Sequence, residues 1–407
     1  MKAYLESIVA FTEKKLEQKP SGWHRLINEL ASTFSDAFDE NAKVVWVSSY
    51  AFPVELLWAF DVAPFDFEIA CNIIPPAISG NGSSIMVTAE NQGYARDICS
   101  FYRLALGAHF QEMVPKGDLF LTSSYYCNGK AKTNELIARA QWKESILFDV
   151  PNEISRSSIE YVSSQLRGIA SRLETVTGNR LDVDRLRESI RWSNTARASF
   201  EQVNELMKAR PSPWDGTKAC FLGIAGSLFW GSQLRHELNV MLIHEMESRI
   251  QAGKAFPESH RILWFPWVPV QQTNIFTTLK EHQASVVTAE SARVYWPEID
   301  ESNPFEGLAL KALNDPHVGS SQRRVKAIVG LAKDYEVDGA IHFSTPACRH
   351  ENGSFSLIRD ALRDEGLPVL NLEADMTDER NYSADKTMTN LLSFFEILKN
   401  SSARGCH

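Results

Sequence analysis

Two stretches of the chain alternate short apolar runs with amphipathic patterns, and the first covers residues 43–151. Its predicted strands are residues 43–49, 118–124 and 144–151. Its predicted helices are residues 53–62, 97–110 and 130–142. Because parallel strands are joined by crossover helices, this alternation predicts a parallel sheet with helices on its faces.

The second alternating stretch covers residues 261–398. Its predicted strands are residues 261–267, 284–291, 339–345 and 368–374. Its predicted helices are residues 274–283, 322–335, 354–366 and 381–398. This stretch therefore predicts a second parallel sheet, and the two halves could resemble each other.

The sequence between these stretches is almost entirely helical in pattern, and Asp182 or Asp184 is placed to cap one of its helices. We therefore predict an α/β protein with two Rossmann-like parallel-sheet domains and a helical connecting region. Residues 1–153 form the N-terminal helix and first α/β domain, residues 154–257 the connector, and residues 258–407 the second α/β domain.

Composition and charge restrict the class of protein. The 407 residues are 44% apolar and 23% charged, as in a globular protein of two or three domains. The net charge of −9 argues against nucleic acid or an anionic membrane as the main partner, because both attract basic surfaces. No apolar run reaches the roughly 20 residues that cross a bilayer. Since the amphipathic N-terminal pattern is unlike a signal peptide, we expect a cytoplasmic protein.

Several nucleotide and hydrolase motifs are absent from the sequence. It contains no P-loop, no dinucleotide-binding G-x-G-x-x-G, no nucleophile elbow and no H-E-x-x-H. The sequence therefore lacks an ATP-binding signature and the usual signatures of hydrolysis.

Three of the six cysteines occupy positions where a parallel sheet binds ligands. Cys127 and Cys348 follow predicted strands, and ligands bind beyond the carboxyl ends of such strands. Cys99 falls in the first turn of a predicted helix, where the dipole favours a thiolate. Each thiol could be a buried packing residue, a nucleophile or a metal ligand. Three thiolates are too few for a closed zinc site, but they suit an iron–sulfur cluster with one iron left open.

Five segments in order make the chain resemble the 2-hydroxyacyl-CoA dehydratase and benzoyl-CoA reductase superfamily over nearly its whole length. They are "SSYAFPVELLWAFDV", "GYARDICSFYRLALG", "PKGDLFLTSSYYCNGKAK", "ACRHENGSFSLIRDAL" and "LPVLNLEADMTDER". The resemblance implies that Cys99, Cys127 and Cys348 hold one [4Fe-4S] cluster. It implies no ligand role for the remaining cysteines, which are Cys71, Cys220 and Cys406.

The resemblance also implies an activity and partners. It indicates an oxygen-sensitive lyase that removes water from an (R)-2-hydroxyacyl-CoA through a ketyl radical after one-electron activation. A separate ATP-dependent iron–sulfur activator protein would deliver the electron, and a paralogous subunit would complete a heterodimer. The glutamate of the dehydratases corresponds to Glu68, and their serine near the open iron corresponds to Tyr50, with Ser49 just before it. These three residues are the catalytic candidates, and the tyrosine leaves the hydroxyl ligand in doubt.

Other interpretations stay open at this point. A benzoyl-CoA-type reductase would use the same cluster on an aromatic thioester, and a double-cubane reductase would need more cysteine ligands. A binding or electron-transfer protein would leave the cysteines inert. Glu68 could be a solvated loop carboxylate, and Tyr50 a packed aromatic. Lys130 and Lys132 are expected to be solvated, and Gly129 is expected to supply unusual backbone dihedrals behind Cys127.

Overall fold

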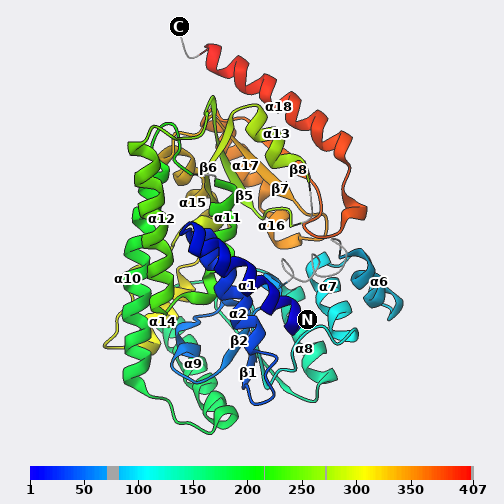
Figure 1. Cartoon of the computed structure of the whole chain (residues 1–407), viewed down its shortest axis with the longest axis vertical. Helices are drawn as coiled ribbons and strands as arrows, with labels where there is room; N and C mark the ends of the chain where they lie inside the picture. The colour runs from blue at the N-terminus through cyan, green and yellow to red at the C-terminus, as the bar shows by residue number, and fades with distance from the viewer. Residues whose placement is uncertain (71–81, 215, 271–272, 405–407) are drawn as a thin grey trace. The chain divides into compact units, whose positions relative to one another are not determined.

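The structure is a computed structural model that describes residues 1–70, 82–214, 216–270 and 273–404 (Figure 1). It divides into two compact units, each assembled from separate parts of the chain. Unit 1 comprises Met1–Phe200, Ala225–Leu242 and Val294–Gly319. Unit 2 comprises Glu201–Ile224, Ile243–Arg293 and Ser320–His407. The region predicted as a connector contributes to both units, and the division at residues 153 and 257 stays a prediction.

Unit 1 contains a four-stranded, all-parallel sheet in the order β2-β1-β3-β4. Its strands are β1 (Val44–Trp46), β2 (Ala63–Phe65), β3 (Leu119–Ser123) and β4 (Glu144–Phe148). Its helices include α1 (Lys2–Gln18), α2 (Gly22–Asp36), α3 (Glu55–Trp58), α4 (Phe67–Ala70), α6 (Ser83–Asn91), α7 (Ser100–Phe110), α8 (Asn128–Ala140), α9 (Arg156–Thr177) and α14 (Pro304–Leu313). The indole of Trp46 packs against Phe65 and Phe120 at centroid distances of 4.9 and 5.1 Å, which centres the core on β1.

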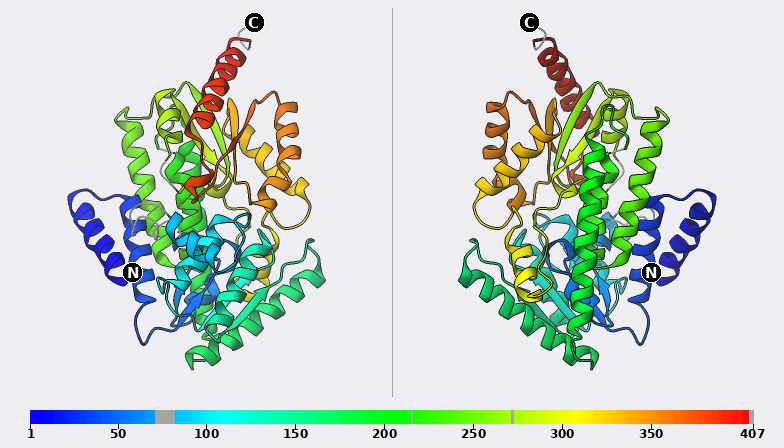
Figure 2. Two further views of the ribbon diagram at one scale, coloured as in Figure 1. Left: turned by 90° about the vertical axis from the view of Figure 1, so that its right-hand side faces the viewer. Right: turned by 90° about the vertical axis from the view of Figure 1, so that its left-hand side faces the viewer.

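Unit 2 contains a second four-stranded, all-parallel sheet in the order β6-β5-β7-β8. Its strands are β5 (His260–Pro266), β6 (Ala284–Ala289), β7 (Gly339–Ser344) and β8 (Val369–Glu373). Its helices include α11 (Gly216–Ala225), α13 (Ile275–Glu281), α15 (Ser321–Asp334), α16 (Arg349–Gly353), α17 (Phe355–Asp364) and α18 (Ala384–Arg404). Figure 2 shows α15 and α17 together on one side of this sheet, with the red helix α18 on the other side.

The two sheets have the same topology, which confirms the fold class and the expected likeness of the two halves. In each sheet the first strand of the unit lies between the second and the third, so the direction of the connections reverses between the first and third strands. A reversal of this kind opens a crevice outside the carboxyl ends of those two strands, where ligands bind. The candidate residues of each unit are therefore expected beyond β1 and β3, and beyond β5 and β7.

Long helices connect the two sheets along the chain. Helices α10 (Val183–Met207) and α12 (Gln233–Gln251) each begin in the residues of unit 1 and end in those of unit 2. Asp182 caps α10, because its carboxylate accepts hydrogen bonds from the backbone N–H groups of Asp184 and Arg185 at 2.9 and 3.2 Å. Of the two predicted caps, Asp182 is therefore the correct one. No helix within the described residues is long and apolar enough to cross a bilayer.

Among the described residues, β2 is the strand that sequence patterning missed. The predicted helix at residues 53–62 is only the four-residue α3, and the chain then forms β2 parallel to β1. Pro64 lies inside β2, and proline lacks the N–H that a central strand would donate. The edge position of β2 accommodates it, but three residues with a proline give no detectable strand pattern.

Candidate functional site

The catalytic candidates of unit 1 lie directly after β1 and its edge neighbour β2. Ser49 and Tyr50 belong to a single 3-10 turn, Ser49–Ala51, that follows β1. Glu68 belongs to α4, which follows the neighbouring strand β2. Because β1 and β2 are parallel neighbours, their carboxyl ends bring these three residues together although 18 positions separate Tyr50 from Glu68.

Ser49 is held by a carboxylate that sequence reasoning did not identify. Both the backbone N–H and the hydroxyl of Ser49 donate to Oδ2 of Asp66, at 2.7 and 2.6 Å. Oδ1 of Asp66 accepts the backbone N–H groups of Glu68 and Ile69 at 2.9 and 3.1 Å. Burial raises the pKa of Asp66, and the hydrogen bonds from Ser49 oppose that rise. Since the Ser49 hydroxyl also lies 2.7 Å from the hydroxyl of Ser227, we assign Ser49 to a network that orders the start of α4.

Glu68 is a buried carboxylate with two tyrosine hydroxyls directed at it. The residue is 6% exposed, so the interpretation as a solvated loop carboxylate is wrong. The hydroxyl of Tyr50 lies 2.8 Å from both carboxylate oxygens, and that of Tyr102 lies 3.4 Å from Oε1. Burial raises the pKa of Glu68 to about 7, although Lys130 lowers it and Asp66 raises it further. A group with this pKa can both accept and return a proton near neutral pH.

Lys130 is buried, contrary to the expectation that it would be solvated. Its side chain is 0% exposed, and Nζ lies 5.0, 5.5 and 5.4 Å from the ring centroids of Tyr50, Tyr125 and Tyr126. Burial lowers its pKa to about 8. The expectation of solvation is correct for Lys132, whose side chain is 64% exposed.

Two of the three predicted cluster ligands flank Tyr102. Cys99 and Cys127 are the N-cap residues of α7 and α8, which pack together, and both are half-buried. The backbone N–H of Gly129 donates to Sγ of Cys127 at 3.2 Å, and the carbonyl of Cys99 accepts the N–H of Tyr102 at 3.1 Å. Burial raises the pKa of Tyr102, and electrostatic interactions with Glu68, Cys127 and Cys99 add to that rise. Because Cys99 is the N-cap residue of α7, it lies one residue before the first helical turn, where we predicted it.

The unusual backbone conformation beside Cys127 belongs to Tyr126 and not to Gly129. Tyr126 has φ 69°, in the left-handed region that non-glycine residues rarely adopt, whereas Gly129 is helical. The glycine is needed for space instead. A Cβ at this position would lie 2.7 Å from a ring carbon of Tyr102 and 3.3 Å from Sγ of Cys127. The expectation about dihedrals at Gly129 is thus wrong, and close approach explains the glycine.

Tyr126 is held in its strained conformation by contacts on several sides. Its hydroxyl donates to Asp315 at 3.1 Å, and its ring stacks on His317 at a centroid distance of 4.2 Å. Its ring also meets the ring of Tyr50 edge-to-face at 4.9 Å. Strain of this kind persists only where the surroundings enforce it, and it is common at functional sites. The residue with this conformation directly precedes Cys127, a predicted cluster ligand.

Cys348, the third predicted ligand, belongs to unit 2. It follows β7 and is the N-cap residue of α16, and its N–H donates to the carbonyl of Thr345 at 2.9 Å. A buried ion network fixes α16, because Arg324 binds both oxygens of Glu290 at 2.6 and 2.7 Å and pairs with Glu351 at 2.5 Å. Each of the three predicted ligands is therefore a cysteine that comes after a strand or loop and directly before a helix. That they share one cluster stays a prediction.

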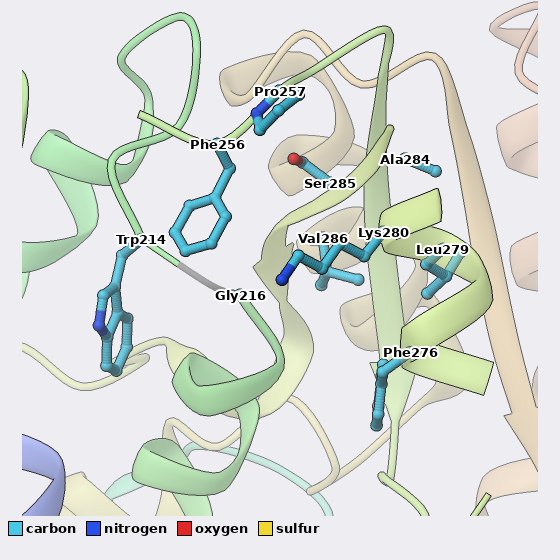
Figure 3. Close-up of a pocket in the computed structure, with 10 residues that line it drawn as sticks. All are labelled: Trp214, Gly216, Phe256, Pro257, Phe276, Leu279, Lys280, Ala284, Ser285 and Val286. Atoms are coloured by element: carbon cyan, nitrogen blue, oxygen red, sulfur yellow. The ribbon is translucent and has the colours of Figure 1, made fainter. Parts of the chain in front are cut away.

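The remaining cysteines and a pocket contribute no candidate chemistry. Cys220 is buried in α11, whereas Cys71 and Cys406 lie outside the described residues. A pocket of unit 2 lies at the amino end of β6 and is lined mainly by Trp214, Phe256 and their apolar neighbours (Figure 3). Its volume of about 70 Å³ is far below the roughly 300–1,000 Å³ of typical ligand pockets. In addition, ligands of parallel sheets bind beyond the carboxyl ends of the strands, whereas this pocket lies at the amino end of β6.

Comparison with known proteins gives one family and several relatives. The family model described as "2-hydroxyglutaryl-CoA dehydratase, D-component" matches residues 49–398. The chain is 25% identical to the (R)-phenyllactyl-CoA dehydratase alpha subunit of Clostridium sporogenes, over 89% of this chain and 91% of that protein. It is 25% identical to the (R)-2-hydroxyglutaryl-CoA dehydratase alpha subunit of Acidaminococcus fermentans, over 72% and 63%. It is 24% identical to a benzoyl-CoA reductase subunit of Thauera aromatica, over 84% and 86%.

Proposed function

The chain belongs to the 2-hydroxyglutaryl-CoA dehydratase D-component family, and on that basis we propose that it is a subunit of an enzyme that removes water from an (R)-2-hydroxyacyl-CoA. The named dehydratase relatives act on CoA thioesters that carry a 2-hydroxyl group, and this substrate class is the one we assign to the chain. The acyl group itself is left unassigned.

The observation that carries this proposal is the environment of Glu68. Dehydration requires a base that removes a hydrogen from the carbon next to the one that loses its hydroxyl. Glu68 is buried at the carboxyl end of the sheet, its pKa is about 7, and the hydroxyl of Tyr50 orients both of its oxygens. We propose that Glu68 takes the proton and that Tyr50 fixes the direction from which the carboxylate approaches.

The residues present fit an iron–sulfur cluster in their chemistry. Cys99, Cys127 and Cys348 are each the N-cap residue of a helix, where free backbone N–H groups favour negatively charged sulfur. An N–H···S hydrogen bond is already present at Cys127. We propose that these three residues would hold a [4Fe-4S] cluster, which would supply the one-electron chemistry that dehydratases of this kind use on a thioester.

The names of the relatives support a subunit that works with partners. The dehydratase relatives above are alpha subunits, and the reductase relative is likewise named as one subunit of its enzyme. We propose a paralogous second subunit, and a separate ATP-dependent activator because the sequence lacks an ATP-binding motif. A cytoplasmic location also stays a prediction.

The proposal is tested by replacing Glu68 with glutamine, which keeps the shape of the side chain and removes the base. We expect turnover of a 2-hydroxyacyl-CoA to fall by about 10²- to 10⁴-fold, because that is the usual contribution of a positioned acid–base group. Iron content should stay near four atoms per chain, as one [4Fe-4S] cluster requires. Glu160→Gln, at an exposed position of α9, should leave turnover unchanged. Undiminished turnover in Glu68→Gln would refute the assignment.

A reductase of the benzoyl-CoA type is the second candidate. The benzoyl-CoA reductase relative favours it. The two activities differ in electron balance. Dehydration returns its electron and consumes none per product, whereas ring reduction consumes reductant in step with product. A double-cubane enzyme would contain about eight irons per chain, twice the content of one [4Fe-4S] cluster.

A further inference from the structure

Lys130 carries an ammonium group inside the tyrosine-lined end of the unit 1 sheet. It is the third residue of α8, and its side chain has no exposed surface. The rings of Tyr50, Tyr125 and Tyr126 surround Nζ at 5.0–5.5 Å. These ring faces attract a cation, but they do not satisfy its N–H groups as oxygen acceptors do.

Within the described part of the chain, Nζ of Lys130 makes no hydrogen bond. An ammonium group has three N–H donors, and burying them without acceptors is costly. Glu68, Cys127, Asp66 and Asp315 are close enough to act on Lys130 electrostatically, although none of them accepts a hydrogen bond from it. These interactions favour the charged form of Lys130 against the cost of burial, while its N–H donors have no acceptor among the described residues.

One tyrosine contacts both Glu68 and Lys130. The hydroxyl of Tyr50 bonds the Glu68 carboxylate, whereas the face of the Tyr50 ring lies against the Lys130 ammonium. Glu68 is thus at the hydroxyl of Tyr50, and Lys130 is at the face of the same ring. A substrate that offers a C–H group to Glu68 would bring its neighbouring oxygen atoms towards Lys130.

We propose that the Lys130 ammonium binds an oxygen atom of the substrate, and that this contact supplies the hydrogen-bond acceptor that the protein lacks at this position. The inference rests on the proposed dehydratase function and deepens it. The oxygen can be the thioester carbonyl, which becomes more negative during one-electron reduction, or the 2-hydroxyl that leaves. Both are oxygen acceptors for a charged donor, and a charge-assisted hydrogen bond is the strong kind.

Equilibrium binding of two thioesters tests this assignment and separates the two oxygens. The full-length protein, purified anaerobically, is titrated by calorimetry without activator or ATP, so that no turnover occurs. One probe is (R)-phenyllactyl-CoA, and the other is 3-phenylpropanoyl-CoA, which keeps the carbonyl and lacks the 2-hydroxyl. The variants are Lys130→Met and Lys130→Gln, either of which suffices if the other fails to fold. Lys132→Met, at an exposed position of the same helix, is the matched control.

We expect the Lys130 variants to bind the hydroxylated probe about 10- to 100-fold more weakly than the wild type, which is the loss of one charge-assisted hydrogen bond. Equal weakening for both probes assigns the carbonyl oxygen, and weakening for the hydroxylated probe alone assigns the 2-hydroxyl. Lys132→Met should bind as the wild type does. Unchanged binding in folded Lys130 variants would overturn the role of Lys130 alone. Failure of the wild type to bind either probe would overturn binding of these thioesters at the site, and with it the assignment of Lys130 to one of their oxygens.

Discussion

Replacing Lys130 with methionine should make the folded protein more stable at neutral pH, although it removes a buried ion. The pKa of Lys130 is lowered by burial from its ordinary value of 10.5 to about 8. A difference of this size corresponds to about 3 kcal/mol of free energy that the buried charge costs the folded state. Methionine fills a similar volume without the charge, so Lys130→Met should unfold with a free energy about 3 kcal/mol higher at pH 7.

The pH dependence gives this prediction a second signature. Below pH 8 the lysine is protonated in the folded and unfolded states, and the full cost is present. As pH rises from 8 towards 10.5, the folded state releases the proton first, so the cost to the wild type declines. The stability difference between variant and wild type should therefore shrink to about 1 kcal/mol near pH 9.5.

Urea unfolding followed by circular dichroism at both pH values measures the two free energies. Lys132→Met, at an exposed position, should change stability by less than about 0.5 kcal/mol. A Lys130→Met variant that is less stable than the wild type at pH 7 would refute the reasoning. The ammonium would then hold the fold together, and its burial could not be attributed to function. A stability cost at a binding group is a common form of the trade-off between stability and activity.

Two further substitutions test the geometry around the carboxylate and the helix. Tyr50→Phe removes the hydroxyl that lowers the pKa of Glu68. The acid limb of the pH–rate profile should therefore move to higher pH by up to about one unit. An unmoved limb would contradict this prediction. Gly129→Ala should destabilise the protein by about 1–3 kcal/mol in urea, because the new methyl group would lie 2.7 Å from the Tyr102 ring. The control Gly168→Ala, in α9 with open space around it, should instead stabilise by about 0.5–1 kcal/mol. Equal effects of the two glycine substitutions would show that close approach is not the reason for Gly129.

Sequence patterning was sufficient for most of the elements. Strands β3 and β5 are buried along their whole length. A parallel strand with both faces covered gives a continuous apolar run in the sequence, and this run can be recognised without knowing the order of the strands. The same patterning placed Cys127 and Cys348 after strands, because strand ends are local properties of the chain. It failed for β2, where Pro64 and a length of three residues removed the signal.

The contacts of the candidate site depended on the order of the strands. Ser49 meets Asp66, and Tyr50 meets Glu68, only because β2 pairs with β1. The glutamate position came from the family resemblance, but its burial, and hence its pKa of about 7, is a property of the folded chain.

Lys130 shows most clearly what the sequence alone determined and what the tertiary structure decided. The segment "CNGKAK" has the polar composition of a helix start on the surface, and the helix is there, with Lys132 exposed as expected. The burial of Lys130 depends on tyrosines from two separate parts of the chain, Tyr50 after β1 and Tyr125 after β3. Composition and periodicity fix local conformation, because they act through neighbours along the chain. Burial and the electrostatic effects that follow from it are set by contacts between distant segments, and these form only when the sheet assembles.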